Sequence, residues 1–91
     1  MDVARFGDDK TVITPRISTK VYEFRKYTKK STMETAGYVL QCAAEYMAKF
    51  KRLKCAIIKV DDSGVGGGVT DRLREVVAEQ HLKYTVLGIN N

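Results

Sequence analysis

The chain has 91 residues, of which 44% are apolar and 30% charged, and its formal net charge is +5. The length allows one small domain, and an ordinary composition with a single proline argues against a disordered chain. No run of about 18 apolar residues exists to span a membrane, and MDVARFGDDK lacks the layout of a signal peptide. We therefore expect one cytoplasmic domain over residues 1–91, whose basic charge favours nucleic acid or another polyanion as partner.

The first third of the chain predicts antiparallel strands. The segment DVARFGDDK predicts a short strand followed by a turn at residues 7–9. Residues 11–17 and 20–27 are rich in β-branched and aromatic side chains and predict a hairpin with a two-residue link. Pro15 has no N–H for a strand ladder, so we expect it near the end of its strand or at a bulge.

A long amphipathic helix follows the hairpin. Ser31 and Glu34 have the spacing of a capping box. The apolar residues behind them recur every three or four positions and predict a helix from near Thr32 to near Arg52. The predicted buried stripe consists of Ala36, Leu40, Ala43, Met47 and Phe50.

The second half predicts two strands around another helix. Residues 55–60 form an apolar run broken only by Lys59, which is typical of a buried central strand. The second helix is marked by Val69, Leu73, Val76 and Val77, and the last strand runs from about Tyr84 to Ile89. The element order is then β-β-β-α-β-α-β, which predicts an α/β fold in which helices pack on a mixed sheet.

The single histidine and the two cysteines have no spacing typical of a metal site. Cys42 and Cys55 fall in a helical and a strand-like segment and are expected to be buried free thiols. His81 lies between the second helix and the last strand and is expected at the surface or at a helix end.

The loop VDDSGVGGGV, residues 60–69, combines two adjacent acids with four glycines. It matches neither the GxxxxGK[ST] pattern nor the third glycine of GxGxxG, which disfavours nucleotide binding. A sharp strand-to-helix turn explains the glycines but leaves Asp61 and Asp62 unexplained.

Asp61 is explained if it meets Asp2. Each lies on or just after a strand that should be central, and neighbouring strands would place the two carboxylates side by side, where they repel unless a cation bridges them. Mg²⁺ and Mn²⁺ prefer oxygen ligands and would attract a nucleic-acid phosphate to this acidic place. A pair of such ions is the usual device for phosphodiester cleavage.

Two segments, DVARFGDDKTVI and IKVDDSGVGGGVTDRL, resemble the C-terminal nuclease domain of the large terminase subunit of tailed bacteriophages and prophages. The resemblance covers essentially the whole chain and implies an RNase H-like fold. It also implies a DNA endonuclease that uses Mg²⁺ or Mn²⁺ to cut concatemeric phage DNA during genome packaging. The implied partners are double-stranded DNA and, in the full protein, an ATPase domain, the small terminase subunit and the portal, all in the cytoplasm of a bacterial host cell.

The resemblance also assigns the acids. Asp2 matches the metal-binding aspartate of the first strand, and Asp61 matches the aspartate that ends the fourth strand, so both would be catalytic. Asp62 follows Asp61 directly and would take part in the metal site. Asp8 and Asp9 match the turn after the first strand and are interpreted as mainly structural.

The chain departs from the family pattern at both ends. Met1 alone precedes Asp2, where family members carry several apolar residues, and the third acidic ligand of the family lies beyond the fifth strand, whereas this sequence ends at LGINN. We therefore expect a piece of a terminase that has little or no nuclease activity alone. An exposed sheet edge and an uncovered apolar face should then make it self-associate.

Two basic clusters are candidate DNA contacts, at residues 25–30 and 49–54. Lys26, Lys29 and Lys30 of the first cluster and Arg52 of the second are predicted to bind DNA. The second cluster fits equally well as a complement to a helix C-terminus. Two other functions stay open: a non-catalytic prophage remnant that serves as an assembly or DNA-contacting module, and another RNase H-like nuclease such as a junction resolvase.

Overall fold

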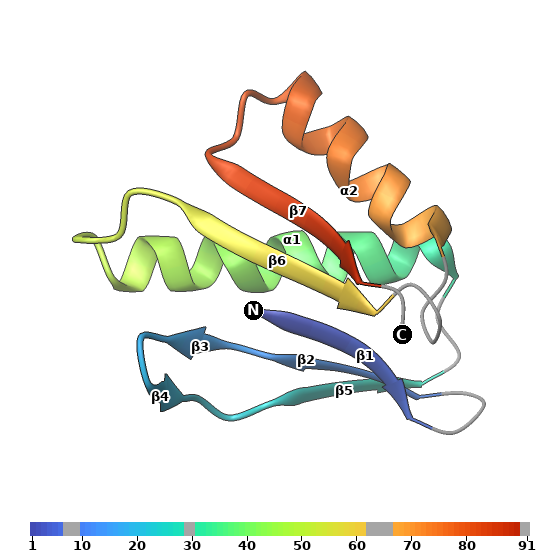
Figure 1. Cartoon of the computed structure of the whole chain (residues 1–91), viewed down its shortest axis with the longest axis horizontal. Coiled ribbons are helices and arrows are strands. Elements are labelled where there is room, and N and C mark those ends of the chain that lie inside the picture. The colour runs from blue at the N-terminus through green and yellow to red at the C-terminus, as the bar shows by residue number, and fades with distance from the viewer. Residues whose placement is uncertain (7–9, 29–30, 62–66, 90–91) are drawn as a thin grey trace.

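A five-stranded sheet with helices packed on it forms the centre of the computed structural model, which describes residues 1–6, 10–28, 31–61 and 67–89 (Figure 1). The strands of this sheet are β1 (Asp2–Phe6), β2 (Lys10–Thr14), β5 (Arg25–Thr28), β6 (Ala56–Asp61) and β7 (Tyr84–Ile89). The helices are α1 (Thr32–Lys49) and α2 (Gly67–Glu79). A separate small hairpin consists of β3 (Arg16–Ile17) and β4 (Lys20–Val21).

The strand order in the large sheet is β5-β2-β1-β6-β7. The β1–β2 and β2–β5 pairs are antiparallel, whereas the β1–β6 and β6–β7 pairs are parallel. Parallel neighbours need a crossover connection, which α1 and α2 supply. The predicted α/β class, the element order β-β-β-α-β-α-β and the mixed sheet with packed helices are therefore confirmed.

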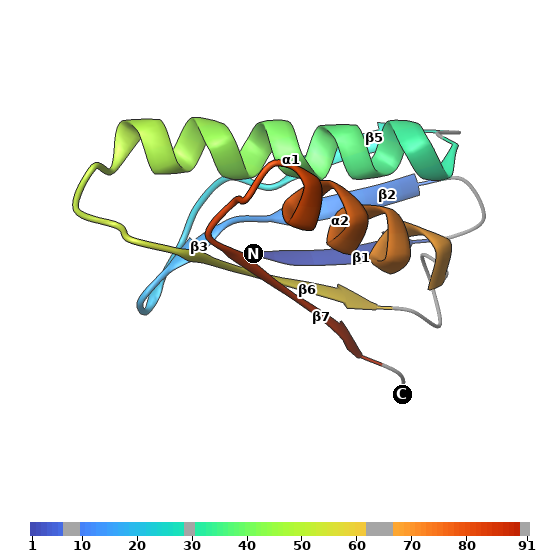
Figure 2. The ribbon, with the colours of Figure 1, turned by 90° about the horizontal axis from the view of Figure 1, so that it is seen from above.

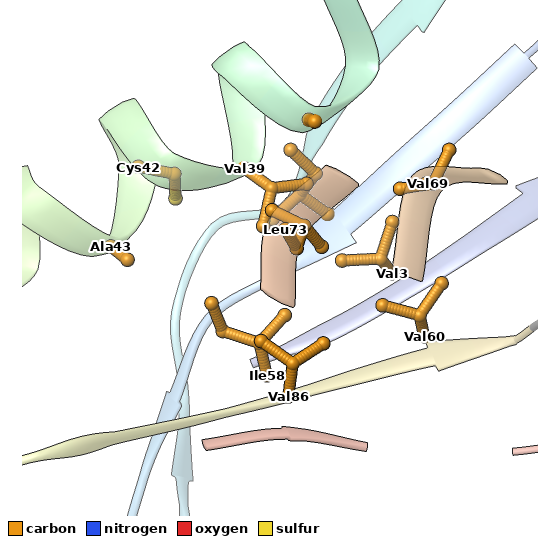
Figure 3. Close-up of a cluster of buried hydrophobic side chains, with 11 residues drawn as sticks. Val3, Val39, Cys42, Ala43, Ile58, Val60, Val69, Leu73 and Val86 are labelled. Atoms are coloured by element: carbon orange, nitrogen blue, oxygen red, sulfur yellow. The ribbon is translucent and has the colours of Figure 1, made fainter. Parts of the chain in front are cut away.

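The hydrophobic core lies between the sheet and the two helices, as Figures 2 and 3 show. Alternate side chains of a strand point to the same face, so each strand contributes every second residue. The strand residues in the core are Val3, Ile13, Ile58, Val60 and Val86. The helices contribute Ala36, Val39, Cys42 and Ala43 from α1 and Val69 and Leu73 from α2. Both helices therefore pack on the same face of the sheet.

The start of α1 agrees with the prediction, but its end and its buried stripe differ. The Glu34 N–H donates to Ser31 Oγ at 3.1 Å, and the Ser31 N–H donates to Glu34 Oε1 at 3.2 Å, which completes the capping box. The helix ends at Lys49 rather than near Arg52. Val39 and Cys42 are fully buried, whereas the predicted Leu40, Met47 and Phe50 are only half-buried. The stripe is rotated because α1 faces α2 as well as the sheet.

Pro15 divides the first arm of the predicted hairpin into β2 and β3, and the second arm is interrupted at residues 22–24, between β4 and β5. It is fully buried between β2 and β3, and its carbonyl accepts a hydrogen bond from the Tyr22 N–H at 2.9 Å. The residues beyond it leave the large sheet and pair only with β4 among the described strands. Ser18, in the turn, has a φ of 57°, which two-residue hairpin turns require at their first position.

The predictions for the cysteines and His81 hold in part. Cys42 is buried in the core, and burial raises the pKa of its thiol, so the thiol stays protonated at neutral pH. Cys55 is exposed, contrary to the prediction, because it precedes β6 instead of belonging to it. His81 is exposed just after α2, with a φ of 52°. No helix built from the described residues is long and apolar enough to cross a membrane.

β7 is an outer strand whose far edge has no partner among the described residues. Its sequence, YTVLGI, contains neither a charged residue nor a proline that would discourage pairing with another strand. Leu87, Ile89 and the neighbouring Ile57 are 41%, 41% and 49% exposed, on the face away from the helices. The described part of the chain thus has an exposed sheet edge and exposed apolar side chains, the two features from which self-association is predicted.

Leu87→Lys is expected to weaken this self-association. The substitution places a charge on the exposed apolar face of β7, where a second copy would have to desolvate it. Sedimentation velocity over the micromolar range should show the wild type forming dimers or larger species and the variant shifted toward monomer. Met33→Lys is the matched control, because Met33 is 65% exposed on α1, away from β7. A wild type that stays strictly monomeric over this range would contradict the prediction.

Candidate functional site

Asp2 and Asp61 lie on adjacent parallel strands in the middle of the sheet. Asp2 begins β1, opposite Lys59 of β6, and Val3 lies opposite Val60. Val3 and Val60 point into the core, so Asp2 and Asp61 lie on the other, helix-free face. Asp61 is two positions beyond Lys59, which puts its Cα about 8 Å from that of Asp2 by standard strand spacing. The two acids are diagonal neighbours on one face, and both are half-buried.

Lys59 is the residue of this site that the sequence patterns did not single out. It is the register partner of Asp2 and shares the helix-free face with Asp61. An ammonium group beside two carboxylates lowers their mutual repulsion, and it can also contact a phosphate oxygen. The sequence carried one signal for this role, because Lys59 is the only charged residue in the apolar run 55–60.

The start of β1 is held firmly against β6. The Met1 ammonium donates to the Ile57 carbonyl at 3.0 Å, and the Lys59 N–H donates to the Met1 carbonyl at 2.8 Å. Burial lowers the pKa of the Met1 ammonium, while the nearby Asp2 carboxylate acts in the opposite direction. These two hydrogen bonds, from the nitrogen and to the carbonyl of Met1, fix the position of the neighbouring Asp2 along β6.

The metal-ligand set in the described part of the chain is small. Among the described residues, no group of three or more His, Cys, Asp or Glu side chains is placed to hold a metal ion. Asp62, the third predicted ligand, lies outside the described residues, as do Asp8 and Asp9. The arrangement seen is therefore a pair of carboxylates, Asp2 and Asp61, beside Lys59.

The predicted DNA contacts fall on two different parts of the molecule. Lys26 lies on β5, is exposed, and holds its ammonium 5.6 Å from the centre of the Phe24 ring. Lys26 pairs with Val12 of β2, and Val12 pairs with Ala4 of β1, so these three side chains lie on one face. Asp2 is two positions from Ala4 and therefore lies on this helix-free face as well. Arg52 is exposed in the turn after α1, and Lys29 and Lys30 lie outside the described residues.

The fold gathers basic side chains around the β3–β4 hairpin and the end of α1. We call this group the basic end; it consists of the exposed residues Arg16, Lys20, Lys49, Lys51, Arg52 and Lys54. The hairpin reaches α1 through Tyr22, whose ring centre lies 5.5 Å from those of both Tyr46 and Phe50. Lys20 and Lys49 lie over the rings of this aromatic cluster.

Arg25 differs from these residues because it forms an ion pair with Glu45 of α1. Its hydrogen bond to Glu45 raises the pKa of its guanidinium further above the ordinary value. Part of its positive charge is therefore balanced within the protein. The sequence pattern placed Arg25 in a basic cluster with Lys26, but the two side chains point to opposite faces of the sheet.

No family model, curated protein or solved structure matches this chain. Its function must therefore be inferred from the placement of Asp2, Asp61 and the basic residues.

Proposed function

We propose that this chain is a segment of the nuclease domain of a phage terminase large subunit, with an RNase H-like fold. The observation that carries the proposal is the placement of Asp2 and Asp61 on adjacent central strands, facing the same helix-free side. These two residues belong to the two motifs that resemble the terminase family. In the full protein the domain would act with an ATPase domain, the small terminase subunit and the portal on double-stranded DNA.

The residues of the site fit a divalent metal ion in charge and in ligand type. Asp2 and Asp61 offer carboxylate oxygens, which Mg²⁺ and Mn²⁺ prefer over nitrogen or sulfur ligands. Asp62 follows Asp61 in the chain and is the candidate for a further oxygen ligand. A bound metal would supply an activated water and stabilise the oxygen that leaves the phosphate.

The chain's own residues would hold the DNA. The basic end attracts the phosphate backbone without regard to sequence, because each contact releases condensed counterions. Lys26 lies on the same sheet face as Asp2 and extends the positive surface across it. Lys59, the register partner of Asp2, would contact the phosphate that approaches the acids.

A second candidate function is a DNA-contacting module without nuclease activity. One observation favours it: Lys59 lies beside the acids. In that case Lys59 would neutralise the carboxylates in place of a metal ion. The basic end would bind DNA in the same way in both functions.

Asp2→Asn and Asp61→Asn are each expected to abolish the weak Mn²⁺ binding of the wild-type chain. Each substitution removes one of the two carboxylate charges, and Mg²⁺ or Mn²⁺ held by few protein ligands keeps most of its waters. We expect the affinity for Mn²⁺ to fall at least tenfold in a calorimetric titration. Plasmid nicking by the wild-type chain should be slight or absent, because the ligand set is sparse for two ions.

Asp71→Asn is the matched control, since Asp71 is an exposed carboxylate on α2 and its loss should leave Mn²⁺ binding unchanged. Mn²⁺ binding that is indifferent to both site substitutions would remove the metal site. Robust plasmid cutting that depends on Asp61 would show that the chain is an active nuclease by itself. DNA binding without Mn²⁺ binding would favour the non-catalytic module.

A further inference from the structure

Residues 20–27, KVYEFRKY, interleave aromatic and basic side chains along the second arm of the hairpin. Within this segment Phe24 is 53% exposed. The Lys26 ammonium lies 5.6 Å from the centre of the Phe24 ring, so a cation accompanies the exposed ring. An exposed aromatic ring beside a basic side chain is the combination from which binding surfaces for single-stranded nucleic acids are built.

The second arm of the hairpin carries an extra residue next to Phe24. In the large sheet Ile13 lies opposite Arg25. In the small hairpin Arg16 lies opposite Val21. Between these two pairs the first arm has two residues and the second arm has three, which is the arrangement of a β-bulge. A bulge changes the faces to which the side chains on either side of it point.

The bulge separates Phe24 from the aromatic cluster on α1. Strict alternation would place Tyr22 and Phe24 on one face of the sheet. Instead, Tyr22 packs against rings of α1, on the helix side. Phe24 lies next to Lys26, which shares the helix-free face with Asp2. Phe24 is therefore directed to the face that carries the acids.

Phe24, Asp2 and Lys59 lie in one row across the sheet. Extending the β2–β5 register by one position puts Phe24 beside Thr14. Thr14 pairs with Asp2, and Asp2 pairs with Lys59. The Cα atoms of Phe24 and Asp2 are therefore two strand spacings apart, about 10 Å. β2 separates Phe24 from β1, and β5 and β7 form opposite edges of the sheet, so Phe24 lies away from both ends of the chain (Figure 1).

We infer that Phe24 stacks an unpaired base of single-stranded DNA on the helix-free face. The Lys26 ammonium contacts the phosphate of that nucleotide, and the strand continues along the row toward Asp2 and Lys59. Stacking accepts any base, because every base has an aromatic face. The inference rests on the proposed function for the choice of DNA alone, since stacking requires neither a metal ion nor cleavage. It adds a site for unpaired bases to the phosphate contacts of the basic end.

Phe24→Trp provides a direct reporter of stacking, because the chain contains no tryptophan of its own. An oligothymidylate of about 12 nucleotides, within the site sizes typical of such surfaces, should quench the fluorescence of the new indole ring. An abasic strand of the same length and charge keeps the phosphates but has no bases, so it should leave the fluorescence unchanged. Both titrations are carried out in EDTA. Quenching by the oligothymidylate would therefore support the stacking site even if the Mn²⁺ titrations remove the metal site.

Phe24→Ala should weaken binding of the oligothymidylate at least fivefold in fluorescence anisotropy, because the stacked base loses its partner. Binding of the abasic strand should stay within a factor of about two, because the phosphate contacts remain. Met33→Ala is the matched control, since Met33 is an exposed apolar residue on α1, on the other side of the sheet. It should leave the binding of both strands unchanged.

Equal affinity of the wild type for the oligothymidylate and the abasic strand would overturn the inference, because binding would then depend on phosphates alone. Unchanged fluorescence of Phe24→Trp with the oligothymidylate bound would also overturn it, because the bases would then stack elsewhere. Equal weakening by Phe24→Ala and Met33→Ala would have the same meaning. The comparison of the two strands on the wild type can refute the inference even if a variant does not fold.

Discussion

Leu73→Ala is expected to lower the free energy of unfolding by about 3–4 kcal/mol. Leu73 is completely buried on α2 and points into the cluster between α1 and the sheet (Figure 3). Removing its branched end loses the burial of apolar surface and leaves a cavity that the surrounding side chains fill only in part. A domain of this size has a total stability of roughly 5–14 kcal/mol, so the loss is a large fraction of it. Urea denaturation followed by circular dichroism measures the change.

Leu87→Ala is the matched control for this prediction. The chemical change is the same, but Leu87 is 41% exposed on the helix-free face of β7. Its truncation should lower the free energy of unfolding by less than about 1 kcal/mol, because less apolar surface is lost from a buried environment. Equal effects of the two substitutions would mean that α2 does not pack on the sheet as described.

Binding of duplex DNA to the basic end is expected to fall about 100-fold when the salt concentration rises from 50 to 200 mM. About four phosphate contacts would give this factor. Each contact releases condensed counterions from the DNA, and added salt opposes that release and so weakens binding. The affinity should be similar for unrelated DNA sequences, since phosphate contacts carry no sequence information. Fluorescence anisotropy with two unrelated duplexes, at several salt concentrations, measures both properties.

Arg52→Glu should weaken this binding and make its salt dependence shallower, because it removes a contact and adds repulsion. Arg72→Glu changes the net charge by the same amount, but Arg72 lies on α2 and already forms an ion pair with Glu75. It should therefore have a smaller effect. Absence of binding at low salt, or binding that high salt leaves unchanged, would indicate that the basic residues serve only to solvate the surface and complement the end of α1.

The strands and helices were largely predictable because their signals are local. The capping box at Ser31 and Glu34 marks the start of α1 correctly. The β-branched and aromatic residues of the last strand delimit β7 at Tyr84–Ile89, as predicted. Pro15 has no N–H for a ladder, which predicts a strand end or a bulge at this position, and the structure divides the arm there into β2 and β3. Each of these features depends on residues within a few positions of one another.

The rotation of α1 and the exposure of Cys55 were not predictable in the same way. Apolar residues at spacings of three and four can be read along two adjacent faces of α1. Packing against both α2 and the sheet decides which face is buried, and that face carries Val39 and Cys42. Cys55 continues the apolar run of β6, but pairing with β7 begins only at Ala56. Burial at these positions depends on distant partners rather than on neighbours in the sequence.

The sequence by itself determined the order of the elements and the candidate acids, because capping, periodicity and turn residues act over short distances. Only the tertiary structure decided which of these residues meet. The register of β1 on β6 sets Asp2 and Asp61 on one face and brings Lys59 beside Asp2. The packing of Tyr22 on Tyr46 and Phe50 brings Arg16 and Lys20 to the end of α1. These contacts join residues that are far apart in the chain, and strand pairing and core packing create them when the chain folds.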